Sequence, residues 1–157
     1  MPKVIISDTS CFILLTTIDH INLLYDLYGD VYTTPEVVLE FGTSLPNWVI
    51  PISSSNQDQK EFLKLQLDEG EASAIALALE MPDCTIILDD TKARKFAKDL
   101  GLSVTGTLGV IIKAKLEGLI PSIKPILSKI KTTNFYISDS LIEKSIQEAE
   151  EDEEFTN

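Results

Sequence analysis

Short runs of β-branched residues alternate along the chain with longer stretches in which apolar residues recur every three or four positions. The short runs have the pattern of strands and the longer stretches that of helices. We predict strands at residues 4–7, 30–33, 48–53, 85–88 and 103–105. Because strands and helices alternate, the pattern indicates an α/β fold with a parallel sheet. The third strand should lie at an edge of the sheet, since Pro51 has no N–H to donate to a neighbour.

Capping residues predict where the helices begin and end. Thr34 followed by Pro35 is typical of a helix start, and Gly42, Gly101 and Gly118 are typical of helix ends. We expect helices within residues 11–29 (one broken helix or two short ones), 34–41, 57–67, 71–79, 89–100, 106–117, 122–130 and 138–151.

Length and apolar content fit a single domain. A chain of 157 residues, 44% of them hydrophobic, encloses one sizeable core. We assign residues 1–146 to this domain and expect the acidic segment 147–157 to be a disordered tail. No apolar run reaches the roughly 20 residues of a membrane span, and the start MPKVIISDTS lacks the layout of a secretory signal. We therefore expect a cytoplasmic protein with no membrane contact.

Charge is distributed unevenly along the chain. The formal net charge of −12 argues against a nucleic-acid partner for the chain as a whole. Residues 86–131, however, hold 9 basic and 4 acidic side chains, a net charge of +5. One predicted helix in this block carries Lys92, Arg94, Lys95 and Lys98. These side chains fit either a phosphate-contacting strip or a solvated helix face.

Acidic residues recur at the start or on the buried side of apolar elements, namely Asp8, Glu40, Glu71, Asp89 and Asp90. A carboxylate beside an apolar run needs a proton, hydrogen bonds or a metal ion, because burying an unpaired charge is costly. Helix capping is the structural alternative for Asp8, where the end of a parallel strand favours a ligand site, and for one of the pair Asp89 and Asp90. Glu71 shares a helix face with apolar residues, and Glu40 opposes the helix dipole. The repetition favours a shared cation site.

The side-chain types indicate which ion would bind. Carboxylates with a single histidine, His20, and no cysteine cluster select Mg²⁺ or Mn²⁺ over Zn²⁺. Hydroxyl groups at or next to strand ends could orient water or phosphate, or cap helices; they belong to Thr9, Ser10, Thr105 and Thr107. The glycine motifs of phosphate loops and dinucleotide sites are absent from the sequence, and the lone His20 is a poor base for serine or cysteine hydrolysis.

Five segments in this order carry a family resemblance: DTS (8–10), PEVVLEF (35–41), GEASAIALA (70–78), DDTKARKFA (89–97) and TGTLGVIIKAKLEGLIP (105–121). Together they resemble the PIN-domain nucleases, in particular the DUF3368 subgroup, which is similar to VapC-like toxins. The resemblance implies a three-layer α/β/α fold around a parallel sheet of about five strands. It also implies catalytic, metal-binding acids at Asp8, Glu40, Glu71 and Asp90, with Asp89 as a supporting metal ligand. The third acid is often Asp in other PIN proteins and is Glu71 here.

Residue types and resemblance together predict a Mg²⁺- or Mn²⁺-dependent endoribonuclease, in which the ion activates water and neutralises charge at phosphorus. Candidate substrate contacts are Thr9, Ser10, Lys92, Arg94 and Thr107. The resemblance implies products with a 5′ phosphate and a 3′ hydroxyl, a toxin role with a small antitoxin as partner, and a homodimer. Two alternatives remain open: a catalytically inactive PIN-like binding or regulatory module, and a metal-dependent phosphohydrolase acting on small phosphate esters.

Overall fold

The computed structural model describes residues 4–151. In this range the strands are β1 (Val4–Ser7), β2 (Val31–Thr33), β3 (Val49–Pro51), β4 (Cys84–Ile87) and β5 (Ser103–Thr105). The helices are α1 (Thr9–Thr17), α2 (Asn22–Tyr28), α3 (Pro35–Phe41), α4 (Gln57–Lys64), α5 (Glu69–Glu80), α6 (Thr91–Asp99), α7 (Thr107–Leu116), α8 (Lys124–Lys131) and α9 (Asp139–Glu148). All five predicted strands are confirmed, and the stretch 11–29 contains parts of two short helices. Within the described residues, no helix is both long and apolar enough to cross a membrane.

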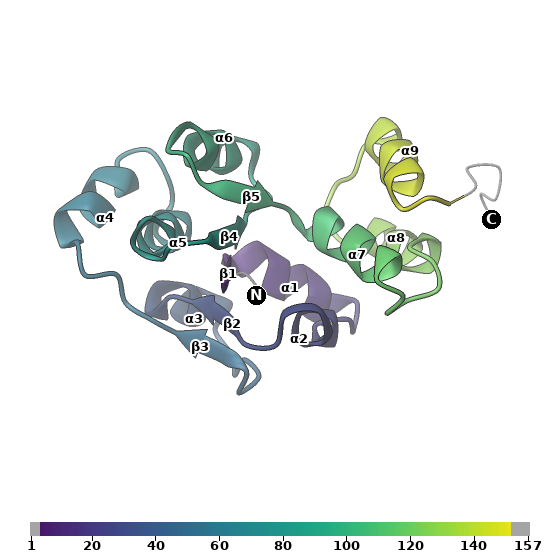
Figure 1. Cartoon of the computed structure of the whole chain (residues 1–157), viewed down its shortest axis with the longest axis horizontal. Helices are drawn as coiled ribbons and strands as arrows, with labels where there is room; N and C mark the ends of the chain where they lie inside the picture. Colours follow the sequence, from purple (N-terminus) through teal and green to yellow (C-terminus); the bar gives the residue numbers. More distant parts are fainter. Residues whose placement is uncertain (1–3, 152–157) are drawn as a thin grey trace.

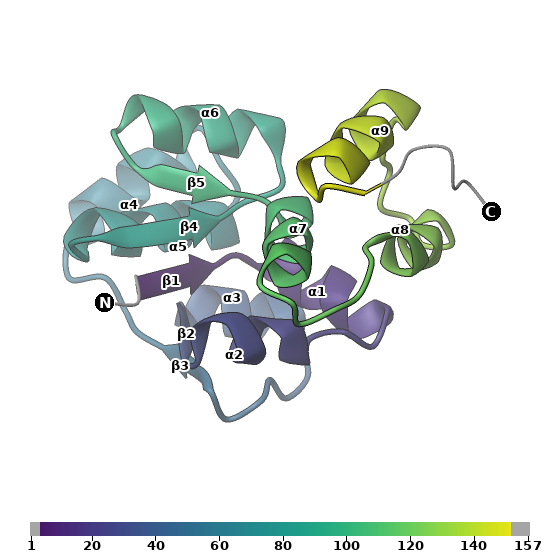
Figure 2. The ribbon, with the colours of Figure 1, turned by 45° about the vertical axis from the view of Figure 1, so that its right-hand side comes forward.

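The strands form one parallel sheet in the order β3-β2-β1-β4-β5. β1 lies at its centre and pairs with β4 from Val4 opposite Cys84 to Ser7 opposite Ile87. β3 is an edge strand, as Pro51 predicts. Figure 2 shows β1, β4 and β5 side by side with their arrows pointing the same way. The carboxyl ends of the strands therefore meet at one edge of the sheet.

Helices cover both faces of the sheet, which makes the fold a three-layer α/β/α sandwich. In Figure 1, α4, α5 and α6 lie on one side of the strands, and α1, α2 and α7 lie on the other, with α8 and α9 beyond α7. Alternate strand side chains point into the two layers. Ile5 and Ile87 join one hydrophobic core, and Ile6 and Ile86 join the other. The predicted α/β class with its parallel sheet is confirmed.

Hydrogen bonds tie the start of α3 to the first turn of α5. The Thr34 hydroxyl accepts from the N–H of Val37, and Pro35 occupies the first turn of α3, as predicted. The same hydroxyl lies 2.7 Å from that of Ser73, which in turn donates to the carbonyl of Gly70. Because the Ser73 hydroxyl already donates its proton to the Gly70 carbonyl, the Thr34 hydroxyl is the donor in the hydrogen bond between Thr34 and Ser73. This contact fixes α3 and α5 relative to each other beside the carboxyl ends of β1 and β2.

The acidic segment that follows residue 146 is partly ordered, which corrects the predicted tail boundary. α9 continues to Glu148, and Ala149 is buried with its carbonyl accepting from Nζ of Lys115. The Glu151 carboxylate accepts from the N–H of Ile123 at 2.7 Å and from the hydroxyl of Ser122. An acid at residue 151 thus binds the free N–H at the start of α8. Residues 152–157 of the predicted tail lie outside the described residues.

Candidate metal centre

The candidate site lies at the edge of the sheet where parallel strands end. Asp8 directly follows β1, and its N–H donates to the carbonyl of Ile87 in β4 at 3.2 Å. On the other side of β1, the hydroxyl of Thr33 at the end of β2 donates to the carbonyl of Ser7. These bonds hold the residue after the central strand between its two neighbours. In open α/β sheets, ligands bind at this edge.

Asp8 is a buried carboxylate with an unused oxygen. The residue is 4% exposed, and its Oδ1 has no hydrogen-bond partner among the described residues. The neighbouring Thr9 hydroxyl is equally buried and equally without a partner there. The pKa of Asp8 is raised to about 7, chiefly because burial disfavours the charged form and further because Asp68, Glu40 and Asp89 are close. A buried oxygen of this kind needs a proton or a cation.

Glu40 faces Asp8 across the first turn of α5. A methyl group built on Gly70 would lie 3.2 Å from Oδ1 of Asp8 and 3.2 Å from each carboxylate oxygen of Glu40. The carboxylates of Asp8 and Glu40 therefore border the same small space, next to the Cα of Gly70. Glu40 is exposed, so this space opens to solvent on the Glu40 side. The structure brings together two of the predicted acids, Asp8 and Glu40, which are 32 positions apart in sequence.

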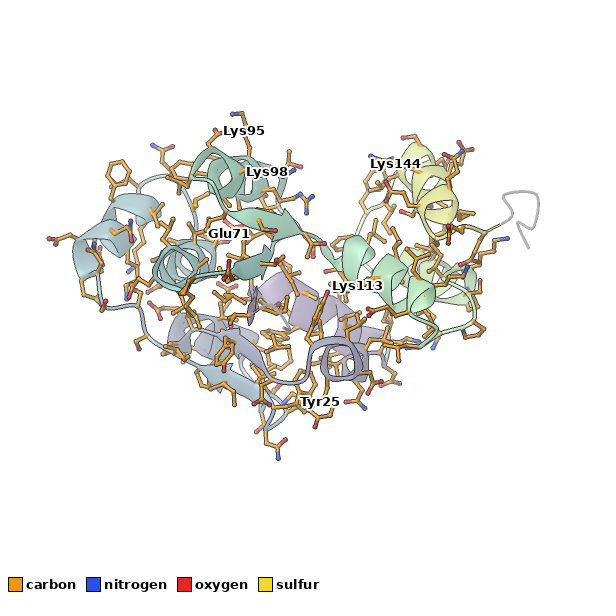
Figure 3. All side chains as sticks on the ribbon, viewed as in Figure 1. Tyr25, Glu71, Lys95, Lys98, Lys113 and Lys144 are labelled. Atoms are coloured by element: carbon orange, nitrogen blue, oxygen red, sulfur yellow. The ribbon has the colours of Figure 1, made fainter. Side chains whose placement is uncertain are left out.

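Glu71 lies beside this pair but is held by a helix cap. Asp68 is the N-cap of α5: its Oδ1 accepts from the Glu71 N–H at 2.8 Å, and the Glu71 carboxylate accepts from the Asp68 N–H at 3.4 Å. Glu71 is half-buried, and its pKa is raised to about 7 by burial first and then by the charges of Asp68, Asp8 and Asp90. In Figure 3, Glu71 lies near β4 and inside the outline of the protein.

Asp68 belongs to the acidic group, and the sequence interpretation missed it. Its charge raises the pKa of both Asp8 and Glu71, so it lies near both. The sequence analysis named Glu71 as the acid of this segment and left Asp68 out of the predicted site. An acidic N-cap three residues before a glutamate is the signature of a capping box, and that signal was available in the sequence.

Asp89 and Asp90 have separate partners. Both carboxylate oxygens of Asp89 accept from Thr107, one from the backbone N–H at 2.8 Å and one from the hydroxyl at 2.5 Å. Asp90 is the N-cap of α6, where its Oδ2 accepts from the Ala93 N–H. The prediction that one of the pair caps the helix is confirmed, and the other acid is engaged by α7 instead of being free.

The hydrogen bonds at these helix starts explain why the acidic side chains are not already arranged around one metal position. Within residues 4–151, no group of three or more acidic, histidine or cysteine side chains stands arranged to hold a metal ion. Glu71, Asp89 and Asp90 each have hydrogen bonds to the backbone that draw their oxygens elsewhere. Three of the five predicted acids thus have partners at helix starts, and the metal-binding roles of these three stay predictions.

A divalent ion still fits the pair that remains. Mg²⁺ is usually bound by one or two carboxylates and keeps several of its waters. Asp8, with its buried unpartnered oxygen, and Glu40, on the solvent side, provide this donor set. Hard oxygen donors without a sulfur or histidine ligand select Mg²⁺ or Mn²⁺. Asp8 and Glu40 would hold the ion, with Glu71 and Asp68 adding negative charge close by.

The predicted substrate contacts fall into two groups. Thr107 is fully buried, and its hydroxyl donates to the Asp89 carboxylate. Arg94 donates from one guanidinium nitrogen to the Leu88 carbonyl, so both residues have a structural partner. Thr9 is buried, whereas Ser10 and Lys92 are exposed. The assignment of Thr107 to phosphate is therefore corrected: its hydroxyl already holds Asp89.

The other predicted basic residues of α6 point outward. Lys95 and Lys98 are both exposed, and in Figure 3 Lys95 lies on the outer side of α6, away from Glu71. Lys95 pairs with the exposed Asp99 at 2.9 Å, one helical turn later. A surface pair of this kind contributes little to stability. The alternative of a solvated helix face, left open by the sequence, describes these two lysines.

Fold and site together define a three-layer α/β/α domain with an acidic site at the carboxyl edge of a parallel sheet. The profile of the DUF3368 family, described as a PIN domain, matches residues 4–151. The chain belongs to this family of PIN domains. PIN domains are generally nucleases and typically use divalent metals, so this is a nuclease-type fold. No curated protein and no solved structure matched the chain.

Metal affinity is expected to fall steeply below neutral pH. The pKa values of Asp8 and Glu71 are both about 7, so either acid must release a proton before it binds or supports a cation. For each proton released, affinity should drop by about tenfold per pH unit below 7. Calorimetric titration of the protein with Mn²⁺ between pH 5.5 and 8.5 measures this slope. An affinity that stays constant over this range would contradict binding at Asp8.

Proposed function

We propose that this protein is a Mg²⁺- or Mn²⁺-dependent endoribonuclease that acts in the cytoplasm. The observation that carries the proposal is the buried, unpartnered Oδ1 of Asp8, which faces the Glu40 carboxylate across Gly70 at the carboxyl edge of the sheet. Such a donor pair suits an oxygen-preferring divalent ion. Membership of the PIN-domain family supports phosphodiester hydrolysis as the chemistry.

The chain's own acids have distinct roles in the proposed reaction. Asp8 and Glu40 bind and orient the ion, which, when bound, supplies a Lewis acid that neutralises the charge developing on the phosphate. Glu71 takes a proton from the attacking water, and a pKa of about 7 suits transfer near neutral pH. The water oxygen bonds to phosphorus as the bond to the 3′ oxygen breaks, and the leaving 3′ oxygen takes a proton from solvent water. The products carry a 5′ phosphate and a 3′ hydroxyl, as the family resemblance implies.

The biological setting is proposed from the resemblance to VapC-like toxins. In that setting the protein is a toxin, a small antitoxin binds it, and it forms a homodimer. The exposed residues Ser10 and Lys92 are candidate RNA contacts, since each lies two positions beyond a predicted acid, Asp8 and Asp90 respectively.

One alternative has an observation in its favour. Three of the five predicted acids bind backbone groups at helix starts, which is what acids with purely structural roles would do. The chain would then be an inactive PIN-like binding or regulatory module. The unpartnered oxygen of Asp8 argues against this reading, because a structural acid in the core would have its hydrogen bonds satisfied.

Incubation with three substrates separates the candidate functions. Labelled single-stranded RNA, labelled single-stranded DNA and a chromogenic phosphate ester are each mixed with the purified protein in Mn²⁺ or in EDTA. We expect cleavage of RNA in Mn²⁺ and none in EDTA. Turnover of the ester alone would identify a small-molecule phosphohydrolase, and inertness toward all three substrates would identify the binding module.

A further inference from the structure

A groove runs along α1, starting beside the candidate metal centre. It has a volume of about 430 Å³ and lies between α1 and the segment that follows α8. α1 contributes Ser10, Ile13, Leu14 and Thr17, and the other wall is formed by residues 132–135. A volume of this size is within the range of small-ligand sites.

The helical repeat connects this groove to the site. The four α1 residues lie at spacings of three, four and seven, so they share one face of the helix. Ser10 is only two positions after Asp8, and at about 1.5 Å per residue the groove extends roughly 10 Å along α1 from Ser10 to Thr17. Asp8 and Ser10 lie within one turn at the start of α1, so an RNA strand with a phosphate at Asp8 would have a neighbouring nucleotide within reach of this end of the groove.

The lining combines an apolar floor with polar groups at the rim. Ile13, Leu14 and Phe135 provide the apolar surface. At the rim, Ser10 and Asn134 are exposed, and their side chains have no hydrogen-bond partner among the described residues. A flat aromatic ring with donors and acceptors along its edge matches this combination, because unpaired RNA bases stack on aromatic rings and bond through their edges.

Positive charge stands next to the groove on an otherwise acidic protein. The exposed Lys129 and Lys131 belong to the last turn of α8, directly before the groove wall at residue 132. Lys129 lies 3.3 Å from the His20 ring, and burial together with the charge of Lys129 lowers the pKa of His20. With a net charge of −12 over the chain, two exposed lysines at this place complement a phosphate backbone.

We propose that this groove binds one unpaired base of the RNA strand next to the cleaved phosphate and so sets base preference. The inference rests on the proposed function, since it takes RNA as the substrate. Phe135 and Ile13 hold the face of the base, Asn134 and Ser10 read its edge, and Lys129 and Lys131 contact the backbone beyond it. Asn134 is the specificity residue, because its amide both donates and accepts.

Crosslinking in EDTA tests occupancy independently of cleavage. A short oligoribonucleotide carrying 4-thiouridine is irradiated with the full-length protein, and the crosslinked peptides are mapped by mass spectrometry. We expect crosslinks within residues 10–17 and 132–136. Crosslinks confined to other segments, or none, would overturn the groove assignment.

A groove-filling variant provides the matched comparison. Ile13 is 49% exposed, so Ile13→Trp adds bulk into the groove without entering the core; Leu116→Trp on α7, also 49% exposed and outside the groove lining, is the control. By fluorescence anisotropy in EDTA, Ile13→Trp should weaken oligoribonucleotide binding about tenfold, and Leu116→Trp should leave it unchanged. Equal binding by both variants would overturn the inference.

The outcomes separate this inference from the proposed function. RNA held in the groove but never cleaved in Mn²⁺ supports the groove and contradicts the nuclease. Cleavage with no groove crosslink contradicts the groove alone. A wild-type dimer that Ile13→Trp converts to a monomer, with RNA binding intact, would identify the groove as a contact between two copies and overturn the base assignment. For an active enzyme, Asn134→Ala should relax base preference at one position in sequenced cleavage products, and an unchanged base preference would contradict the role given to Asn134.

Discussion

Asp8→Asn is expected to reduce Mn²⁺-dependent RNA cleavage by about a hundredfold or more, because it removes the charge of the one buried acid within residues 4–151 whose oxygen has no other partner. Even groups that only support metal ligands cost up to about a hundredfold when changed, so a direct ligand should cost at least as much. Cleavage of labelled RNA under single-turnover conditions measures the loss.

The same substitution should stabilise the metal-free protein. Asp8 has an ordinary pKa of 3.8 and a folded-state pKa of about 7, so its charge opposes folding. The stability associated with protonated Asp8 is present below pH 4 and is lost as the pH rises toward 7. Asparagine cannot ionise, so the gain of the variant over wild type should grow between pH 4 and 7 and reach roughly 1 to 4 kcal/mol above it. Urea unfolding in EDTA measures this difference.

Asp139→Asn is the matched control for both effects. Asp139 is an exposed aspartate in the first turn of α9, far in sequence from the site. Its replacement should leave RNA cleavage and Mn²⁺ binding unchanged. If Asp8→Asn cleaved RNA as well as this control, or destabilised the protein above pH 7, the role assigned to Asp8 would be wrong.

Gly70→Ala should weaken Mn²⁺ binding tenfold or more while the metal-free fold persists. The added methyl would lie 3.2 Å from three carboxylate oxygens, one of Asp8 and two of Glu40, which is the space a bound ion and its waters need. The metal-free fold should tolerate the change, because alanine is favoured over glycine in helices by up to about 1 kcal/mol. Calorimetric titration with Mn²⁺ and urea unfolding in EDTA measure the two effects.

Glu69→Ala tests whether any change in this turn has the same effect. Glu69 precedes Gly70, is exposed, and its carboxylate pairs with Lys64 on the protein surface. Its loss should change Mn²⁺ affinity much less than Gly70→Ala does. Wild-type Mn²⁺ affinity in Gly70→Ala would mean that the ion does not bind between Asp8 and Glu40.

Much of the fold follows from local sequence signals. β-branched runs and capping residues are local, so the strands and the start of α3 at Thr34 could be predicted. The parallel sheet then brings the residues after β1 and β4 to one edge, which places Asp8 and Asp89 near each other, as the effect of Asp89 on the pKa of Asp8 indicates. These acids lie close together because of the topology of the parallel sheet, and the pattern of strands in the sequence already predicts that topology.

What the sequence could not provide depends on contacts between distant residues. The hydrogen bonds from Thr107 to Asp89 join positions 18 apart, and the approach of Gly70 to Asp8 depends on how α5 packs against α3. A helical face drawn through Glu71 and the apolar residues after it predicted an inward carboxylate, but the cap formed with Asp68 turns it back toward the helix start. The hydrogen bond from the Ile123 N–H to the Glu151 carboxylate likewise orders a segment whose composition is typical of disorder.

The central claim is that Asp8 and Glu40 together hold one divalent ion. Diffraction from a crystal soaked in Mn²⁺, recorded where manganese scatters anomalously, tests it most directly. The account predicts an anomalous peak between Oδ1 of Asp8 and the Glu40 carboxylate, within bonding distance of both, that is absent from crystals of Asp8→Asn. A soaked wild-type crystal with no peak there, or with manganese bound only elsewhere, would contradict it.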